Sequence, residues 1–158
     1  MPNITPCLWF DTEGEDAAKF YTSVFPNSKI TKVTTWPDRP EGGALTVEFE
    51  LDGERFMALN GGPQFSFTEA VSLSVECQSQ QEVDAYWATL AEGGEEGPCG
   101  WLKDRFGLSW QIVPEVLPRL LSDPDQEKAQ RVMAAMMKMG KIEIAELERA
   151  AEGAAIRS

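Results

Sequence analysis

Hydrophobic and polar residues alternate with a period of two in several short stretches of the chain, and this period predicts half-buried strands. The clearest stretch is 101–114, which reads WLKDRFGLSWQIVP. Within it, residues 108–113 alternate so that one face is large and apolar while the other carries a single amide, Gln111. A Phe-Gly pair interrupts the run, so residues 101–103 are expected to form the first arm of a hairpin. A lone polar group on the inward face of a small sheet is typical of a ligand or metal site, which makes Gln111 the first candidate.

The same patterns divide the preceding residues into further strands and two helices. Strands are expected where apolar or β-branched residues alternate with polar ones: 4–10, 29–36, 45–51, 55–60 and 71–77. Helices are expected where apolar residues recur every three or four positions: 16–25 and 81–90. The Pro- and Gly-rich stretch between them at 37–43 predicts a loop.

The pattern of the first elements recurs 65 residues later in the chain. That shift places Leu8 on Leu73 and Tyr21 on Tyr86. An internal repeat of this length predicts two copies of one supersecondary unit. In each copy a strand, a helix and further strands would follow one another, with the helix on one face of a small sheet and the other face curled around a pocket.

The character of the sequence changes after residue 114. A short apolar segment spans 116–121, the Ser-Asp-Pro sequence at 122–124 predicts a helix start, and 126–139 carry a methionine-rich helical stripe. A last, acidic helix is expected around 144–151. The expected fold class is α+β. Residues 1–114 would form the paired modules, at about 1–62 and 68–114. Residues 115–158 would form a helical tail that packs on the modules or on a dimer partner.

Composition narrows the function classes. The formal net charge of the 158 residues is −12, which disfavours nucleic acid and anionic membrane surfaces as partners. No run approaches the ~20 apolar residues that a membrane helix needs. The chain has three cysteines, without a CxxC pair or a signal-peptide pattern, so a cytoplasmic location with reduced thiols is expected.

Histidine is absent from the chain. Its absence excludes His-based triads, the usual zinc sites and the commonest general base at neutral pH. No glycine-rich dinucleotide or phosphate loop is present, so no nucleotide cofactor is expected. Asp104, in the hairpin, is the candidate catalytic carboxylate, or equally a turn residue that binds its own backbone. Trp9 and Trp101 fall on the polar sides of their strands, where they could line a cavity.

Five segments together resemble one known family: LWFDTEGEDAAKFY, FMALNGGPQFSF, EVDAYWATL, CGWLKDRFGLSWQIVP and DPDQEKAQRVMAAMMKM. They are similar to the PhnB-like proteins, also labelled 3-demethylubiquinone-9 3-methyltransferase-like, of the glyoxalase/bleomycin resistance/dioxygenase (vicinal oxygen chelate) superfamily. The likeness runs from about residue 4 to 150. It implies two tandem βαβββ modules that form a curled mixed sheet around a pocket. It also implies a homodimer in which sheets from two chains complete each pocket.

The resemblance also indicates where a metal would bind. The metal enzymes of this superfamily place His, Glu or Gln ligands on pocket-facing strand positions, which fall here near Thr5, at 57–58, near Ala70 and at Gln111. Of these residues only Gln111 can ligate a divalent ion, and a catalytic site needs three or more protein ligands. We therefore expect no bound metal and no cofactor. Methyl transfer is not expected either, because nothing in the chain resembles an adenosylmethionine pocket.

Three functional hypotheses remain open. The first is a metal-free protein that binds a small, partly apolar molecule in a pocket lined by Trp9, Asn60, Trp101 and Gln111. The second is an enzyme acting on a small oxygenated or aromatic metabolite, with Asp104 or a glutamate as base and Asn60 and Gln111 as hydrogen-bond donors. The third is protein interaction through the dimer and the methionine-rich tail.

Overall fold

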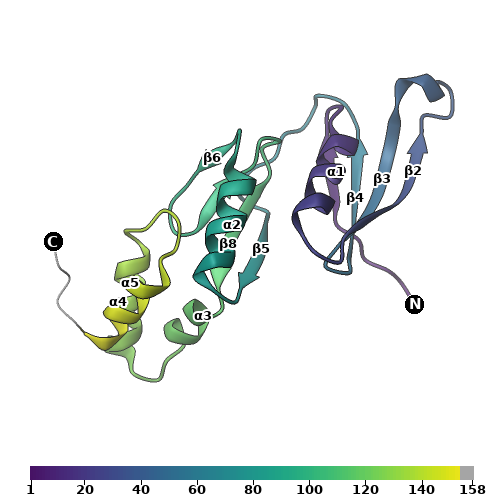
Figure 1. Cartoon of the computed structure of the whole chain (residues 1–158). Helices are drawn as coiled ribbons and strands as arrows, with labels where there is room; N and C mark the ends of the chain where they lie inside the picture. The colour runs from purple at the N-terminus through teal and green to yellow at the C-terminus, as the bar shows by residue number, and fades with distance from the viewer. Residues whose placement is uncertain (154–158) are drawn as a thin grey trace. The chain divides into compact units, whose positions relative to one another are not determined.

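Two four-stranded mixed sheets, each with one helix on one face, make up the framework of the computed structural model (Figure 1). The structure describes residues 1–153. The chain divides into two units, Met1–Phe67 and a second that begins at Thr68.

The first unit has the order strand, helix and three strands. Its elements are β1 (Cys7–Phe10), α1 (Gly14–Val24), β2 (Lys29–Thr35), β3 (Ala44–Leu51) and β4 (Glu54–Asn60). The strand order is β1-β4-β3-β2, with β1 and β4 parallel and the other pairs antiparallel. The apolar side of the alternation packs against α1, where Leu8, Phe49 and Ala58 are buried together with Ala17 and Tyr21. A short 3₁₀ turn, η1 (Pro40–Gly42), lies in the β2–β3 loop.

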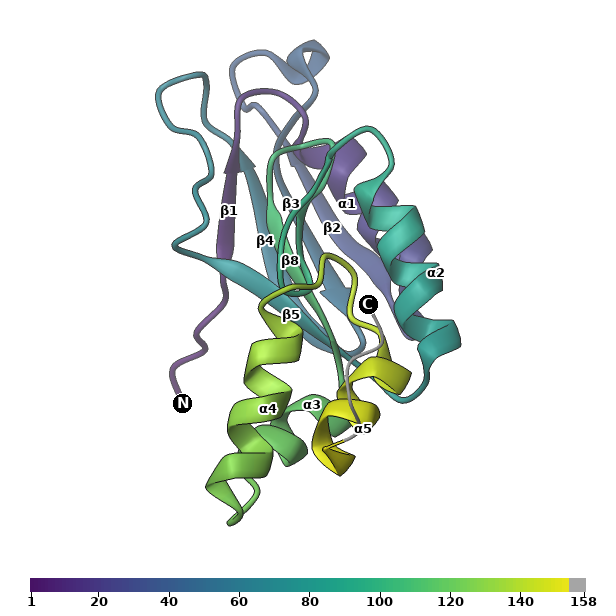
Figure 2. The same cartoon turned by 90° about the vertical axis from the view of Figure 1, so that its left-hand side faces the viewer.

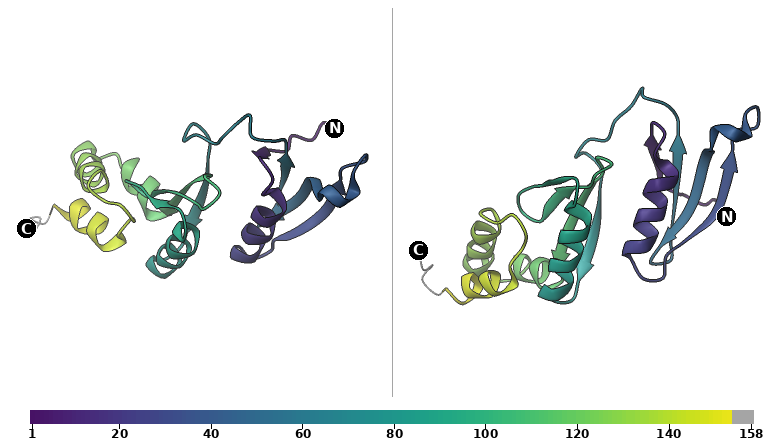
Figure 3. Two further views of the ribbon diagram at one scale, coloured as in Figure 1. Left: turned by 90° about the horizontal axis from the view of Figure 1, so that it is seen from above. Right: turned by 45° about the horizontal axis from the view of Figure 1, so that its top comes forward.

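The second unit repeats this topology. Its elements are β5 (Ser72–Cys77), α2 (Gln80–Ala91), β6 (Glu95–Glu96), β7 (Trp101–Lys103) and β8 (Ser109–Pro114). The strand order β5-β8-β7-β6 matches that of the first sheet, again with one parallel pair, β5 and β8. The prediction of an α+β chain with two βαβββ modules is therefore confirmed. In Figure 3, α1 and α2 each run along one side of their own sheet.

Three helices follow the second sheet: α3 (Val116–Leu121), α4 (Gln126–Met136) and α5 (Ile144–Glu152). Figure 2 shows them beside one another. They share an apolar cluster formed by Val116, Leu117, Val132, Ile142 and Leu147, against which Val113 of β8 also packs. Two backbone hydrogen bonds of 2.8 Å, from Cys99 to Met139 and from Gly100 to Gly140, join the tail to the loop before β7. None of the helices in residues 1–153 combines the length and apolarity needed to cross a bilayer.

Several element ends differ from the sequence expectation by a few residues, among them the starts of β1 and α4. The first strand begins at Cys7 rather than at residue 4. The helix expected to start at 122–124 begins instead at Gln126, because the Asp125 side chain accepts a hydrogen bond from Lys128 N and provides the N-cap. Pro124 therefore precedes the cap and is not at the first helical position.

Candidate functional site

The second sheet has one face that α2 does not cover, and we call it the open face. Leu102, Trp110 and Ile112 point toward α2 and are buried. Because side chains alternate along a strand, their neighbours lie on the other side. The open face therefore carries Ser72, Trp101, Lys103, Ser109 and Gln111.

Two residues expected to bind the ligand are adjacent on this face. Trp101 of β7 and Gln111 of β8 are directly opposite in the antiparallel pair, and both are half-buried. Gln111 Nε2 donates a 3.0 Å hydrogen bond to Ser72 Oγ of the neighbouring strand β5. This bond fixes the orientation of the amide beside the flat indole of Trp101. An amide and an indole side by side offer hydrogen bonding and apolar contact, which is the usual composition of a small-molecule site.

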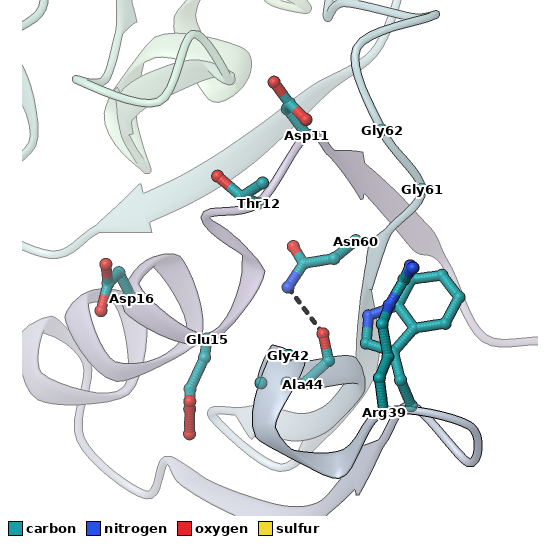
Figure 4. A pocket seen from close by; sticks show the side chains of 12 residues that line it. Asp11, Thr12, Glu15, Asp16, Arg39, Gly42, Ala44, Asn60, Gly61 and Gly62 are labelled. Atoms are coloured by element: carbon teal, nitrogen blue, oxygen red, sulfur yellow. Dashed lines mark hydrogen bonds between the residues drawn. The ribbon is translucent and has the colours of Figure 1, made fainter.

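A cavity of about 480 Å³ lies in the first unit, where β1 and β4 end and α1 begins (Figure 4). Asn60 lines it, but both ends of its amide already have partners. Gly14 N donates to Asn60 Oδ1 at 2.8 Å, and Asn60 Nδ2 donates to Ala44 O at 3.0 Å. Asn60 thus joins the first turn of α1 to the start of β3 and positions the cavity wall.

The opposite wall of this cavity comes from the β2–β3 loop. The Arg39 guanidinium lies 4.4 Å from the centre of the Trp36 ring, in a cation–π contact. Asp11, Glu15 and Asp16 also line the cavity. Sequence patterns predicted only a loop around Arg39, because a stacking contact within a Pro- and Gly-rich stretch leaves no periodic signal.

Trp9 lies on the face of the first sheet that points away from α1. Its Nε1 donates a 2.9 Å hydrogen bond to Gly62 O, and its ring meets that of Phe65 edge-on at 4.9 Å. A Cβ atom at Gly61 would lie 2.3 Å from the Trp9 ring, so the chain passes directly over the indole. Trp9 is therefore held by the segment that follows β4.

Asp104 is 2% exposed and is surrounded by donors. Its Oδ1 accepts hydrogen bonds from Phe106 N at 2.8 Å and Leu108 N at 3.1 Å, and its Oδ2 accepts one from Trp110 Nε1 at 2.8 Å. This geometry favours the turn role over the catalytic one, because a base must have an oxygen that can reach substrate. The structure thus brings only Trp101 and Gln111 together, on the open face of the second sheet. Trp9 and Asn60 lie on opposite faces of the first sheet, and Asp104 is buried in the β7–β8 turn.

The metal positions carried over from the superfamily do not fit a divalent ion. Ala58 is buried in the first core at 1% exposure, and Met57, Thr5 and Ala70 supply no set of carboxylate or imidazole donors. Within residues 1–153, no three Cys, Asp or Glu side chains gather closely enough to hold a metal. The Gln111 amide donates to the Ser72 hydroxyl, which is a weak metal ligand.

Comparison with known proteins adds a family and a fold. Residues 2–113 match the family model described as 3-demethylubiquinone-9 3-methyltransferase. A solved PhnB protein from Bacillus cereus, described as a putative 3-demethylubiquinone-9 3-methyltransferase, is 32% identical with a TM-score of 0.64. The match covers 72% of this chain and 99% of that one. No curated protein matches the chain.

Two more distant structures share the fold. Protein PA1353 from Pseudomonas aeruginosa is 20% identical with a TM-score of 0.61, and the match covers 73% of this chain and 98% of that one. The fosfomycin resistance protein FosX from Listeria monocytogenes is 17% identical with a TM-score of 0.55, covering 77% and 98% of the two chains. The expected glyoxalase/bleomycin resistance fold is thereby confirmed.

Proposed function

The chain belongs to the PhnB-like, 3-demethylubiquinone-9 3-methyltransferase-like family of the vicinal oxygen chelate superfamily, and from this premise we propose that it binds a small molecule without a metal ion. The open face of the second sheet is the proposed binding surface. One observation carries the proposal: Trp101 and Gln111 are directly opposite on neighbouring strands, with the Gln111 amide oriented by Ser72. Trp9, on the face of the first sheet that points away from α1, would contribute the corresponding surface of the first unit, whereas Asn60 lies on the α1 side of that sheet and shapes the cavity there.

The metal-free part of the proposal rests on donor chemistry. A divalent ion in a catalytic site takes three or more protein ligands, and the superfamily positions offer one amide here. The residues between β1 and α1 do not favour methyl transfer either. The connection from β1 to α1 is Asp11-Thr12-Glu13, an acidic turn rather than the glycine-rich loop that would approach a nucleotide-like cofactor.

We propose a homodimer, since the resemblance implies that sheets from two chains complete each pocket. A cytoplasmic location agrees with three cysteines that form no disulfide with one another: Cys7, Cys77 and Cys99. Molar mass by light scattering tests the dimer directly, and a monomer at micromolar concentration would remove it.

The first test of the proposed function measures metal content and ligand binding separately. Protein purified without chelator should contain far less than one metal per chain, and its melting temperature should not respond to Ni²⁺, Mn²⁺, Zn²⁺ or Mg²⁺. A stoichiometric metal that raises the melting temperature would overturn the metal-free part.

Binding itself is tested by an NMR screen of small metabolites on the ¹⁵N-labelled protein. Hits should shift the Trp101 indole N–H and the Gln111 side-chain amide. Gln111→Ala should weaken them, whereas Gln130→Ala, the same change at an exposed position of α4, should not. Hits that perturb only other surfaces would contradict the assignment to the open face.

A further inference from the structure

Ser109, at the start of β8, has a buried hydroxyl that no group within residues 1–153 satisfies. The residue is 0% exposed. Among the side chains of residues 1–153, Ser109 Oγ is the one buried oxygen or nitrogen atom without a hydrogen-bond partner. The adjacent Ser72 does not serve as its partner and instead accepts from Gln111. Buried hydroxyl groups are nearly always paired, so an unpaired one points to a group that binds there.

Ser109 lines a cavity of about 220 Å³ on the open face. Glu69, Glu95, Trp101 and Lys103 line it as well. The cavity therefore combines a buried hydroxyl, an indole and charged side chains of both signs within a single unit of the chain.

The charges of this cavity do not balance. The Lys103 ammonium forms an ion pair with Glu69 and lies opposite Glu95 in the β6–β7 pair. The third glutamate of the lining, Glu96, accepts a 2.7 Å hydrogen bond from Trp87 Nε1 of α2 and so faces the other side of the sheet. Two carboxylates against one ammonium leave one negative charge in excess, in a chain whose net charge is −12. A cationic group is attracted there and a carboxylate or phosphate is repelled.

We propose that this cavity binds a small primary amine, whose ammonium donates a hydrogen bond to Ser109 Oγ beside Glu69 and Glu95 while its apolar part lies on the Trp101 ring. The inference rests on the proposed function, because it assigns a ligand chemistry to the same open face. A primary ammonium is both a donor for the hydroxyl oxygen and a cation for the carboxylates and the indole.

Three probes of nearly equal size test the charge: benzylamine, benzyl alcohol and benzoate, each titrated by NMR into the full chain. Benzylamine should shift the Trp101 indole N–H and the Ser109 backbone amide. It should bind about tenfold more tightly than benzyl alcohol, as one cation–π contact with partial charge compensation provides. Benzoate should not bind at this cavity. Equal binding of the amine and the alcohol would overturn the charge assignment.

Two variants test the residues. Ser109→Ala should fold at least as well as the native chain, because it removes an unpaired buried hydroxyl. It should weaken benzylamine binding about tenfold, as should Glu95→Gln, whereas Ser23→Ala in α1 should have no effect. Unchanged binding in Ser109→Ala would overturn the proposal and leave a buried water as the partner of the hydroxyl.

The outcomes separate this inference from the proposed function. One outcome is that compounds without an amine shift the Trp101 and Gln111 signals while benzylamine does not bind. In that case the assignment of an amine to the cavity is wrong, and the open face stands as the ligand site. If no small molecule perturbs the open face, both fall.

Discussion

The Trp110 indole donates its Nε1–H to Asp104 Oδ2 at 2.8 Å, and both side chains are buried at 2% exposure. The other carboxylate oxygen of Asp104 accepts two backbone N–H groups of the β7–β8 turn. One carboxylate thus closes the hairpin and ties it to a buried tryptophan of the second core. This arrangement explains an acidic residue inside a small domain without any catalytic role, because a buried charge is tolerated when its oxygens accept several hydrogen bonds.

Asp104→Asn is expected to destabilise the protein, because the amide nitrogen of Asn must face one of these donors. The loss should be about 1–3 kcal/mol in the free energy of unfolding, measured in urea. Trp110→Phe, which keeps a ring and removes the N–H, should cost a similar amount. The double variant should cost less than the sum of the two, since both single changes break the same bond. Additive effects would show that the Trp110–Asp104 bond contributes little.

Substitution of Asn60 is expected to lower the free energy of unfolding, because both ends of its amide bind the backbone. Asn60→Ala leaves both Gly14 N–H and Ala44 C=O without their partner and should cost about 1–3 kcal/mol. Asn60→Asp should cost free energy as well, because a carboxylate oxygen can still accept from Gly14 but repels the Ala44 carbonyl. Urea unfolding measures the loss, and hydrogen exchange at the Gly14 amide locates it. Asn3→Ala, at an exposed position, is the control. A native exchange rate at Gly14 in Asn60→Ala would contradict the bridge.

Gly61→Ala is expected to displace the Trp9 side chain. The new Cβ would lie 2.3 Å from the indole ring, and overpacking of this kind costs about 1–3 kcal/mol. The Trp9 indole N–H, which donates to Gly62 O, should move in the ¹⁵N spectrum. Gly107→Ala separates space from backbone strain, because its φ is +90° and a Cβ there meets nothing within 4 Å. Gly61→Ala should lose less free energy of unfolding in a Trp9→Leu variant than in the native chain. An equal loss in both would show that the clash with the indole ring is not the cause.

The hydrophobic periodicity of the sequence predicts most of the strands and helices. The alternation in 108–113 correctly separates Trp110 and Ile112, which face α2, from Gln111, which does not. The shift of 65 residues correctly equates the two modules, because equal faces and equal loop signals produce equal strand orders. The two-residue strand β6 was missed, since Glu95-Glu96 is polar and too short to show any period.

The hydrogen bonds of the candidate site could not be predicted in this way. Gln111 and Ser72 are 39 residues apart, and Asn60 and Gly14 are 46 apart. Such contacts depend on strand register and on side-chain rotamers, neither of which alters the hydrophobic pattern. The unpaired hydroxyl of Ser109 could not be predicted either, because the hydrophobic pattern assigns a serine on a strand to the exposed face.

Cys77 is expected to be the least reactive thiol of the chain. Burial of the thiol is the main cause that raises the pKa of Cys77 to about 11, and the negative charges of Glu82 and Glu76 raise it further. At pH 8 roughly one thiol in a thousand would be ionised, and the thiolate is the reactive form. Iodoacetamide should therefore modify Cys77 more slowly than the exposed Cys7, as measured by mass spectrometry. Partial burial of the Cys7 thiol raises the pKa of Cys7 as well.

The same shift of the Cys77 pKa predicts how stability depends on pH. Because the folded pKa lies above the usual value of 9.0, the protonated thiol contributes stability fully below pH 9, and this contribution is lost as the pH rises through about 11. Cys77→Ala cannot titrate there, so the difference in unfolding free energy between the native chain and the variant should shrink from pH 8 to pH 11 in urea titrations. Lysines and tyrosines titrate in the same range in both proteins and cancel in this difference. A difference that stays constant with pH, or Cys77 labelling as fast as that of Cys7, would show that the thiol is accessible to water.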